Sequence, residues 1–375
     1  MELVNTTPYV VGCTMGTDKS GLDYILAVVK ATFNLPNNGV SVLSVEQRPL
    51  VLADVFSGEP GYSATLVESD FALFKPNCDV LLTGSAYSPN GKPSTSVIVA
   101  LSVGTVNKSF RVTGFRQWKL GALGAIAPGE STHFTKMPFS YDTAFGGIDN
   151  FHPDVQKHTS YFENPVGIGY HKELDGALVH GAPMPNTEVL GENIRSPIRN
   201  YRPMAFGPVG RGWPQRLRYA GTYDEVWQKN KFPFLPDDFD NRYFQAAPLD
   251  QQIQYIKGGE RVVLQNLTEN GYCSFCLPRM NLESVVFYLQ TGEFYIAKFA
   301  VDSIHFFPDE GVYTMTARAS VPFSGDPQIC AKVIFGRGSK AWIRAIENGK
   351  KFIARDRKLK KPKFSKVLSE TEDTE

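Results

Sequence analysis

Six arginines in the middle of the chain carry side-chain chemistry suited to binding. They lie between Asn193 and Tyr223, a stretch of 31 residues without Asp, Glu or Lys, here called the Arg-aromatic segment. Arg recognises planar acidic groups through paired hydrogen bonds and stacks on aromatic rings. Arg, Trp and Tyr also dominate the energetically important positions of protein interfaces. The sequence therefore predicts a partner-binding surface formed chiefly by Arg199, Tyr201, Arg202, Arg211, Trp213 and Arg216.

The same arginines also suit a purely structural role. A long irregular segment leaves many backbone carbonyls without partners, and guanidinium groups satisfy them. Carboxylates that follow in the sequence offer ion-pair partners, namely Asp237, Asp238 and Asp240. Changing a brace would leave a buried carboxylate unpaired, whereas changing an interface arginine would weaken only the complex. Bracing and binding both remain open for each arginine at this point.

Three carboxylates nearby raise the alternative of a hydrolase. Asp142, Asp149 and Glu163 would have to place two carboxyl groups about 5–10 Å apart to cleave a glycosidic bond. Their separation does not follow from the sequence, and Asp149 after Gly-Gly-Ile is also typical of a turn. The chain contains no Gly-x-Ser-x-Gly elbow, phosphate-binding loop or His-Glu-x-x-His motif. We expect a protein that is not an enzyme, with a β-sandwich hydrolase of glycan or cell-wall material as the alternative.

The cysteines and histidines do not form a recognisable metal or redox motif. Cys273 and Cys276 are spaced as a pair, but their flanks indicate a strand, which sends the two side chains to opposite faces. The other cysteines are isolated in sequence, and so are the loop histidines: Cys13, Cys78 and Cys330, with His152, His158, His171 and His180. We therefore expect no metal, no cofactor and reduced thiols.

Composition and charge restrict the classes of partner. The 375 residues are 42% hydrophobic and 21% charged, with a net charge of +1. A neutral molecule has no general attraction to nucleic acid or to an anionic membrane. No apolar run approaches the ~20 residues that span a bilayer, and the first residues lack signal-peptide character. We expect a cytoplasmic protein with no nucleic-acid, membrane or small-molecule partner.

Strand patterns dominate on both sides of the central region. Residues 24–33 are apolar, an Asn-Gly turn signal follows at 37–39, and residues 40–45 alternate, which predicts a hairpin. Further strands are predicted at 79–87, 96–106 and 108–118, and again at 260–267, 272–277, 285–289, 294–299, 301–307 and 312–319. Residues 223–229 are compatible with a short helix.

The centre is irregular in sequence but not low in complexity. Residues 138–221 hold nine Pro and eleven Gly, which exclude long helices and strands. Abundant aromatic and branched residues argue against disorder. The expected fold is mainly β, with two antiparallel β-sandwich or barrel-like lobes joined by a long ordered Pro/Gly-rich irregular region and few short helices. The expected segments are 1–137, 138–250, 251–325, 326–355 with a helix at 339–352, and a charged flexible tail at 356–375.

An ordered series of motifs gives the sequence a resemblance to a known family. They are Asn5–Tyr9, Val29–Phe33, Glu68–Phe71, Lys75–Val80, Gly114–Trp118, Met137–Phe139, Ala144–Asp149, Asn164–Gly169, Pro185–Glu188, Gly221–Tyr223, Leu235–Asp240 and Ala246–Gln251. Together they resemble the bacterial family called domain of unknown function 2169, found with type VI secretion systems. The resemblance fades after about residue 325.

The resemblance implies an adaptor or chaperone rather than an enzyme. Such a protein would bind a secreted effector and help to load it onto a spike component of the PAAR or VgrG type. No catalytic residues follow from the resemblance. It agrees with a sequence that lacks catalytic motifs and carries the Arg-aromatic segment.

Overall fold

The chain folds into several β-sheets with little helix, so the predicted mainly β fold is confirmed. The computed structural model describes residues 1–121, 124–172, 179–280, 282, 285–290, 294–323 and 330–336. Within these residues the α-helices are short, α2 (Pro214–Leu217) and α3 (Glu225–Asn230), and α3 agrees with the helix predicted near 223–229. The helix expected at 339–352 and the tail at 356–375 lie outside the described residues.

The first large sheet has six strands in the order β19-β7-β24-β25-β3-β2. Its strands are β2 (Val10–Thr17), β3 (Asp23–Asn34), β7 (Cys78–Leu82), β19 (Gln252–Ile253), β24 (Ala300–Phe307) and β25 (Val312–Phe323). β3 and β25 pair antiparallel along their full length, from Asn34 opposite Val312 to Asp23 opposite Phe323. β3 is buried on both faces over most of its length, which explains its continuous apolar sequence.

The second large sheet also has six strands, in the order β18-β10-β9-β20-β21-β4. Its strands are β4 (Asn38–Val40), β9 (Ser96–Val103), β10 (Val106–Thr113), β18 (Thr187–Glu188), β20 (Arg261–Gln265) and β21 (Tyr272–Cys276). β9 alternates between buried and less buried residues, as expected for a strand with one face on the core.

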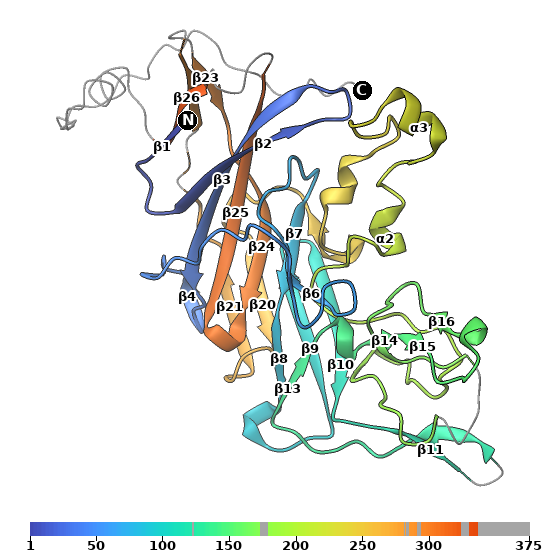
Figure 1. Ribbon diagram of the computed structural model, residues 1–375. Coiled ribbons are helices and arrows are strands. Elements are labelled where there is room, and N and C mark those ends of the chain that lie inside the picture. Colours follow the sequence, from blue (N-terminus) through green and yellow to red (C-terminus); the bar gives the residue numbers. More distant parts are fainter. Residues whose placement is uncertain are drawn as a thin grey trace.

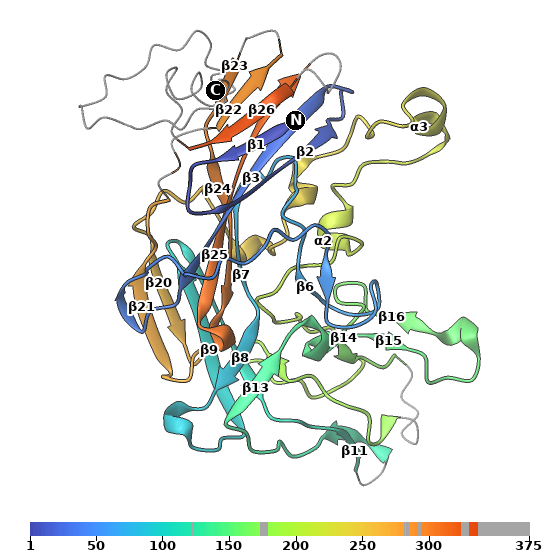
Figure 2. The same ribbon diagram turned by 60° about the vertical axis from the view of Figure 1, so that its left-hand side comes forward.

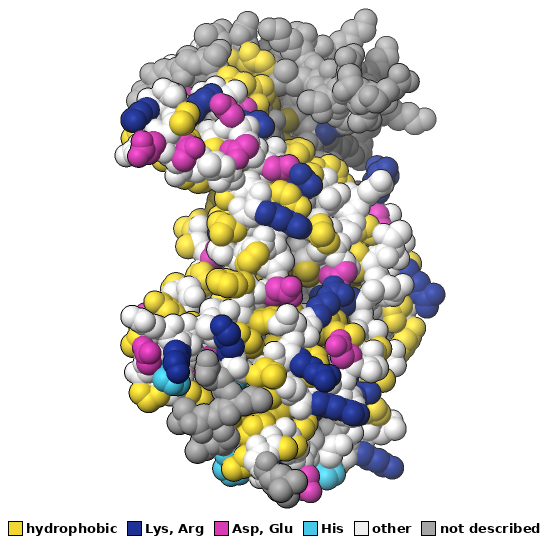
Figure 3. Space-filling model, turned by 90° about the vertical axis from the view of Figure 1, so that its right-hand side faces the viewer, with side chains coloured by type: hydrophobic (Ala, Val, Ile, Leu, Met, Phe, Trp, Pro, Cys, Tyr) yellow, Lys and Arg dark blue, Asp and Glu magenta, His cyan; other side chains and the backbone are white. Residues whose placement is uncertain are grey.

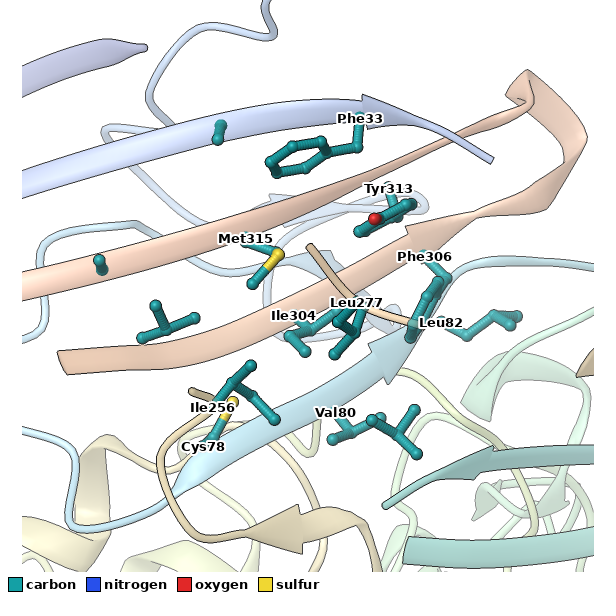
Figure 4. Packing of buried hydrophobic residues seen from close by; sticks show 14 of the residues in the cluster. Phe33, Cys78, Val80, Leu82, Ile256, Leu277, Ile304, Phe306, Tyr313 and Met315 are labelled. Carbon is teal, nitrogen blue, oxygen red and sulfur yellow. The ribbon is translucent and has the colours of Figure 1, made fainter. Parts of the chain in front are cut away.

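One hydrophobic core lies between the two large sheets. Buried side chains of both sheets belong to the same cluster, and Figure 4 shows part of it around Tyr313. The Tyr313 ring lies 5.4 Å from those of Phe33 and Phe306 in its own sheet and 5.5 Å from that of Phe275 in the other sheet. Such aromatic contacts join the two sheets into a sandwich.

The expected boundaries at 137 and 251 do not separate the sheets. β7 pairs in parallel with β24, and β9 pairs antiparallel with β20, so each large sheet combines strands from both ends of the chain. Figures 1 and 2 show the blue and orange strands side by side. Local sequence patterns define strands but do not define partners that lie some 200 residues away.

The hairpin predicted at 24–45 forms only in part: backbone hydrogen bonds of 2.9 Å join Asn34 to Val42 and Ser44 to Thr32. β4 covers only Asn38–Val40 and pairs in parallel with β21, while an isolated bridge joins Phe33 to Leu43. The alternating valines that suggested a strand point outward, and the side chain of Val45 is almost fully exposed. Residues 38–40 therefore extend the second large sheet, and residues 42–44 pair briefly with the end of β3 in the first.

A smaller sheet and several short pieces complete the structure. The smaller sheet has the order β1-β26-β22-β23, with β1 (Glu2–Asn5), β22 (Val285–Leu289), β23 (Phe294–Ala297) and β26 (Cys330–Phe335). Two-stranded pieces are β5 (Val55–Phe56) with β6 (Thr65–Val67), β8 (Gly84–Tyr87) with β13 (Lys136–Phe139), β11 (Trp118–Leu120) with β12 (Ile126–Pro128), β14 (Phe145–Gly146) with β17 (Ile168–Gly169), and β15 (Ile148–Asp149) with β16 (Thr159–Ser160). The 3-10 helices are η1 (Pro89–Gly91), η3 (Tyr141–Thr143), η4 (Val155–Lys157), η5 (Asn241–Phe244), η6 (Leu249–Gln251) and η7 (Pro308–Glu310).

Two glycines show how the irregular centre is held together. Gly146 and Gly147 have φ of 150° and 105°, and a Cβ on either would lie 2.1–2.3 Å from a backbone oxygen, that of Asn164 or Gly167. Glycine is required at both positions, because any other residue would combine positive φ with a clash against the backbone. The described part of residues 138–250 lies along one side of the sandwich, in green and yellow in Figure 1.

A basic, tyrosine-lined cleft as candidate functional site

A cleft of about 600 Å³ lies where the Arg-aromatic segment meets β10, η5 and η6. Its charged lining has five basic and two acidic side chains: Lys108, Arg202, Arg216, Arg218 and Arg242, with Glu163 and Asp250. Its aromatic lining consists of Tyr141, Tyr161, Tyr201 and Tyr219. Figure 3 shows the side of the molecule that carries α2 and α3, where basic side chains are distributed among hydrophobic ones.

One wall of the cleft places two cations on a single carboxylate. Lys108 Nζ lies 3.4 Å from Asp250 Oδ1, and Arg202 lies 2.6 Å from Asp250 Oδ2. Lys108 is buried and also donates to Gln251 Oε1 at 2.7 Å, whereas the Arg202 side chain is 59% exposed. Burial lowers the pKa of Lys108 to about 8; Asp250 opposes this shift and Arg202 adds to it.

Arg216 forms the floor of the cleft and is a structural brace. It makes a buried ion pair with Glu68 and donates to the carbonyl oxygens of Val209 and Tyr243 at 2.8–3.0 Å. Glu68 directly follows β6, and Asp70 in the same segment bonds to Lys30 and Thr316 of the first large sheet, so the pair ties this segment to α2. A buried pair of this kind is costly to break, because the remaining charge stays buried.

Another part of the lining carries two guanidinium groups in contact with one tyrosine ring. The guanidinium carbons of Arg218 and Arg242 lie 4.8 and 4.4 Å from the ring centre of Tyr219. Arg242 is also paired with Asp240 at 2.6 Å. Within the part of the chain that the structure describes, no carboxylate lies at ion-pair distance from Arg218. Arg218 therefore keeps an exposed positive charge at the rim of the cleft.

The structure brings some of the predicted partner-binding residues together and separates others. Tyr201, Arg202 and Arg216 line the cleft. Arg199 is exposed but lies outside the cleft lining. Two more serve as internal contacts: Arg211 makes two hydrogen bonds to Asp54, and Trp213 is buried with its ring edge against Tyr141, 5.1 Å between centres. The binding prediction therefore stays open for the exposed arginines, while Arg211 and Arg216 have bracing partners.

The three candidate carboxylates occupy different environments. Asp142 accepts hydrogen bonds from two serine hydroxyls and a backbone amide at 2.6–3.0 Å, which fixes a turn. Asp149 is buried, accepts from the Lys172 amide at 2.8 Å, and lies 3.5 Å from His171 Nδ1. Glu163 is the member of the three that lines the cleft, and together with burial it raises the pKa of the adjacent Tyr161 to about 12.

The cysteines and histidines lie in separate places. Cys273 is buried and Cys276 is exposed on β21, as expected for opposite faces of a strand, and all five cysteines are free thiols. Among the described residues no group of three or more His, Cys, Asp or Glu side chains is arranged to hold a metal ion. No helix in the same part of the chain is long and apolar enough to cross a membrane.

The sequence pointed to only part of the cleft. Lys108, Arg242 and Asp250 come from β10, η5 and η6, and nothing in their local sequence places them beside the Arg-aromatic segment. Lys108 did give one signal, because it occupies an inward position in the alternation of β10, between the buried residues Val106 and Phe110. Burial of a charged side chain is unfavourable unless it is paired, so a charged residue at such a position indicates an ion pair or a functional role.

Comparison with known proteins identifies one family. The model of the family described as "Uncharacterized protein conserved in bacteria (DUF2169)" matches residues 20–318, which include the second large sheet, most of the first large sheet and the whole described cleft. No curated protein and no solved structure matches the chain.

Proposed function

Given that the chain belongs to the DUF2169 family of bacterial proteins, we propose that it is a non-enzymatic adaptor of a type VI secretion system. In this role it binds a secreted effector in the cytoplasm and helps to load it onto a spike component of the PAAR or VgrG type. The effector and the spike component are its protein partners, and this loading role requires no cofactor. The cleft beside the Arg-aromatic segment is the surface that holds the effector.

The composition of the cleft is the observation that carries this proposal. Four of its five basic side chains are arginines, and Arg and Tyr are among the residue types that stabilise protein interfaces most per residue. The tyrosines supply rigid apolar area, and the guanidinium groups supply hydrogen bonds that remain strong when water is partly excluded. The molecule as a whole has a net charge of +1, so the positive character is local.

The exposure of the arginines separates the binding role from the bracing role. The side chain of Arg202 is 59% exposed and that of Arg242 is 54% exposed, whereas that of Arg216 is 3% exposed. An exposed arginine can be removed at little cost to folding, because a surface ion pair contributes about 0–1 kcal/mol. The exposed members therefore report on binding without a large effect on stability.

The test combines co-purification with thermal unfolding. Tagged protein from the native host should retain a secreted effector or a spike component, identified by mass spectrometry. The variants Arg202→Ala and Arg218→Ala should melt within about 2 °C of the parent and retain much less effector, because each loses about 1–4 kcal/mol of binding. Arg261→Ala is the matched control, since Arg261 is exposed on β20 and outside the cleft.

Two results would count against the proposal. One is retention of the effector at the parental level by a folded Arg202→Ala, Arg218→Ala double variant. The other is the recovery of proteins that are neither exported effectors nor spike components. Equal loss in the Arg261→Ala control would show that the binding defect is not specific to the cleft.

A further inference from the structure

The charges on one wall of the cleft do not balance. Lys108 and Arg202 share the single carboxylate of Asp250, and the second hydrogen bond of Lys108 goes to a neutral amide oxygen, that of Gln251. One positive charge on this wall is therefore unmatched. A buried or half-buried charge without a partner is unfavourable, so this wall would be stabilised by one further carboxylate.

The rest of the cleft does not supply that carboxylate. Arg216 and Arg242 are already paired with Glu68 and Asp240. Glu163 is the other acidic side chain of the lining, but the structure pairs it with neither Lys108 nor Arg202. The surplus positive charge at Lys108 and Arg202 thus faces an open, tyrosine-lined space of about 600 Å³.

We propose that this cleft recognises an acidic, extended peptide segment of the protein partner, with one carboxylate seated between Lys108 and Arg202 and the adjoining apolar or aromatic side chain on the tyrosines. Charge complementarity selects the acidic group, and the tyrosine lining together with the open shape selects a peptide over a small inorganic anion. This inference makes the proposed function more specific. It rests on the proposed function only for the identity of the partner as an effector or a spike protein.

Lys108 gives this mode of binding a pH signature. The groups that face its amine are Asp250, Arg202 and the neutral amide oxygen of Gln251. Tyr141 also lines the cleft, and burial raises the pKa of its phenol far above neutrality. With its pKa lowered to about 8, Lys108 is partly deprotonated in mildly alkaline solution. An arriving carboxylate favours the charged amine and raises the pKa of Lys108, so binding takes up protons near pH 8 and weakens as the pH rises further.

The direct test uses a defined peptide and the full-length protein. The probe is an N-acetylated, C-amidated peptide of sequence Gly-Glu-Tyr-Glu-Gly, and its control replaces both Glu by Gln. Calorimetry at low salt should show binding of the acidic peptide that is at least about tenfold stronger than that of the control. Titrations near pH 8 in two buffers of different ionisation enthalpy should reveal proton uptake. Inorganic phosphate that competes at the same concentration as the peptide would overturn the choice of a peptide.

Two charge variants of the wall should act in opposite directions. Arg202→Gln removes the surplus charge, so peptide affinity should fall about tenfold or more and the pKa of Lys108 should rise. Asp250→Asn adds to the surplus wherever Lys108 stays protonated, so in mildly acidic solution the affinity for the acidic peptide should increase, and the pKa of Lys108 should fall further. The control Arg261→Gln should change neither quantity. If Arg202→Gln and Asp250→Asn shift the affinity in the same direction, or if Glu and Gln peptides bind alike, the inference is wrong.

The outcomes also separate this inference from the proposed function. Acidic-peptide binding that depends on Arg202, with effector retention unchanged in Arg202→Gln, would support the recognition mode and count against the effector role of the cleft. Effector retention that is lost in Arg202→Gln, without discrimination between Glu and Gln peptides, would support the role of the cleft and overturn acidic recognition.

Discussion

Replacing Arg216 by Met tests whether the Arg-aromatic segment is anchored by a buried ion pair. The side chains of Arg216 and Glu68 are 3% and 6% exposed, so the substitution leaves a carboxylate in a site that water hardly reaches. Met keeps the length and the apolar part of the side chain. The change therefore removes charge and hydrogen bonds with little loss of packing.

The contacts of Arg216 set how much stability the Arg216→Met variant loses. Breaking a buried pair by removing one partner costs about 3–5 kcal/mol. This figure includes the donors that the carbonyl oxygens of Val209 and Tyr243 lose, because lost hydrogen bonds are part of breaking such a pair. Arg211 lies 3.5 Å from Glu68 and offsets part of the loss. We expect about 3–5 kcal/mol in total, which lowers the melting temperature by about 4–6 °C for a cooperative unit of this length.

The assay is thermal and urea unfolding of four proteins, the parent, Arg216→Met, Glu68→Gln and the double variant. The double variant should recover part of the loss, because a neutral amide at position 68 no longer leaves a buried charge unpaired. Arg218→Met is the matched control, since it changes an exposed arginine of the same segment. An Arg216→Met protein that melts within about 1 °C of the parent, with no coupling in the cycle, would refute the bracing role.

Two further predictions concern stability elsewhere. Gly147→Ala should lower the free energy of unfolding by about 1–3 kcal/mol, because the φ of Gly147 is 105° and the new Cβ would meet a backbone oxygen. The control Gly212→Ala has nothing within 4 Å of its Cβ and should melt like the parent. Equal melting temperatures for the two variants would contradict this prediction. Burial lowers the pKa of His305 to about 3, so its contribution to stability is present above about pH 6.5 and is lost as the pH falls toward 3. His305→Gln should make the decline in melting temperature between pH 6.5 and 4 shallower, and a decline parallel to that of the parent would exclude this origin.

Local patterns predicted the individual strands well. The strand predicted at 24–33 is β3 (Asp23–Asn34), and the one predicted at 312–319 is the first part of β25 (Val312–Phe323). In both, a run of apolar residues is enough, because such a run has to be buried wherever it pairs. The hairpin at 24–45 formed only in part, with residues 42–44 against the end of β3, because an Asn-Gly turn signal gives no information on how far the second strand stays with the first.

The pairing of strands that are distant in the sequence, and the residues that form the cleft, were harder to predict from the sequence than the strands themselves. β7 pairs with β24, and β9 pairs with β20, because their side chains are buried in a shared core, and no local pattern encodes this pairing. The cleft was predicted only from its arginines. The wall of the cleft that carries Lys108 forms because η6 follows Pro248 directly and turns Asp250 and Gln251 toward the inward-facing Lys108.

The arginines of one segment divide between bracing and binding according to which carboxylates the fold brings to them. Arg211 and Arg216 pair with Asp54 and Glu68, which flank the β5–β6 pair, so their charges are used inside the protein. Arg202 meets only an acid that Lys108 already shares. The braces thus fix the floor of the cleft while the charge at its rim stays available. Because Arg216 belongs to both the brace and the lining, its loss should weaken partner binding through the shape of the floor, and Arg202 should affect binding alone.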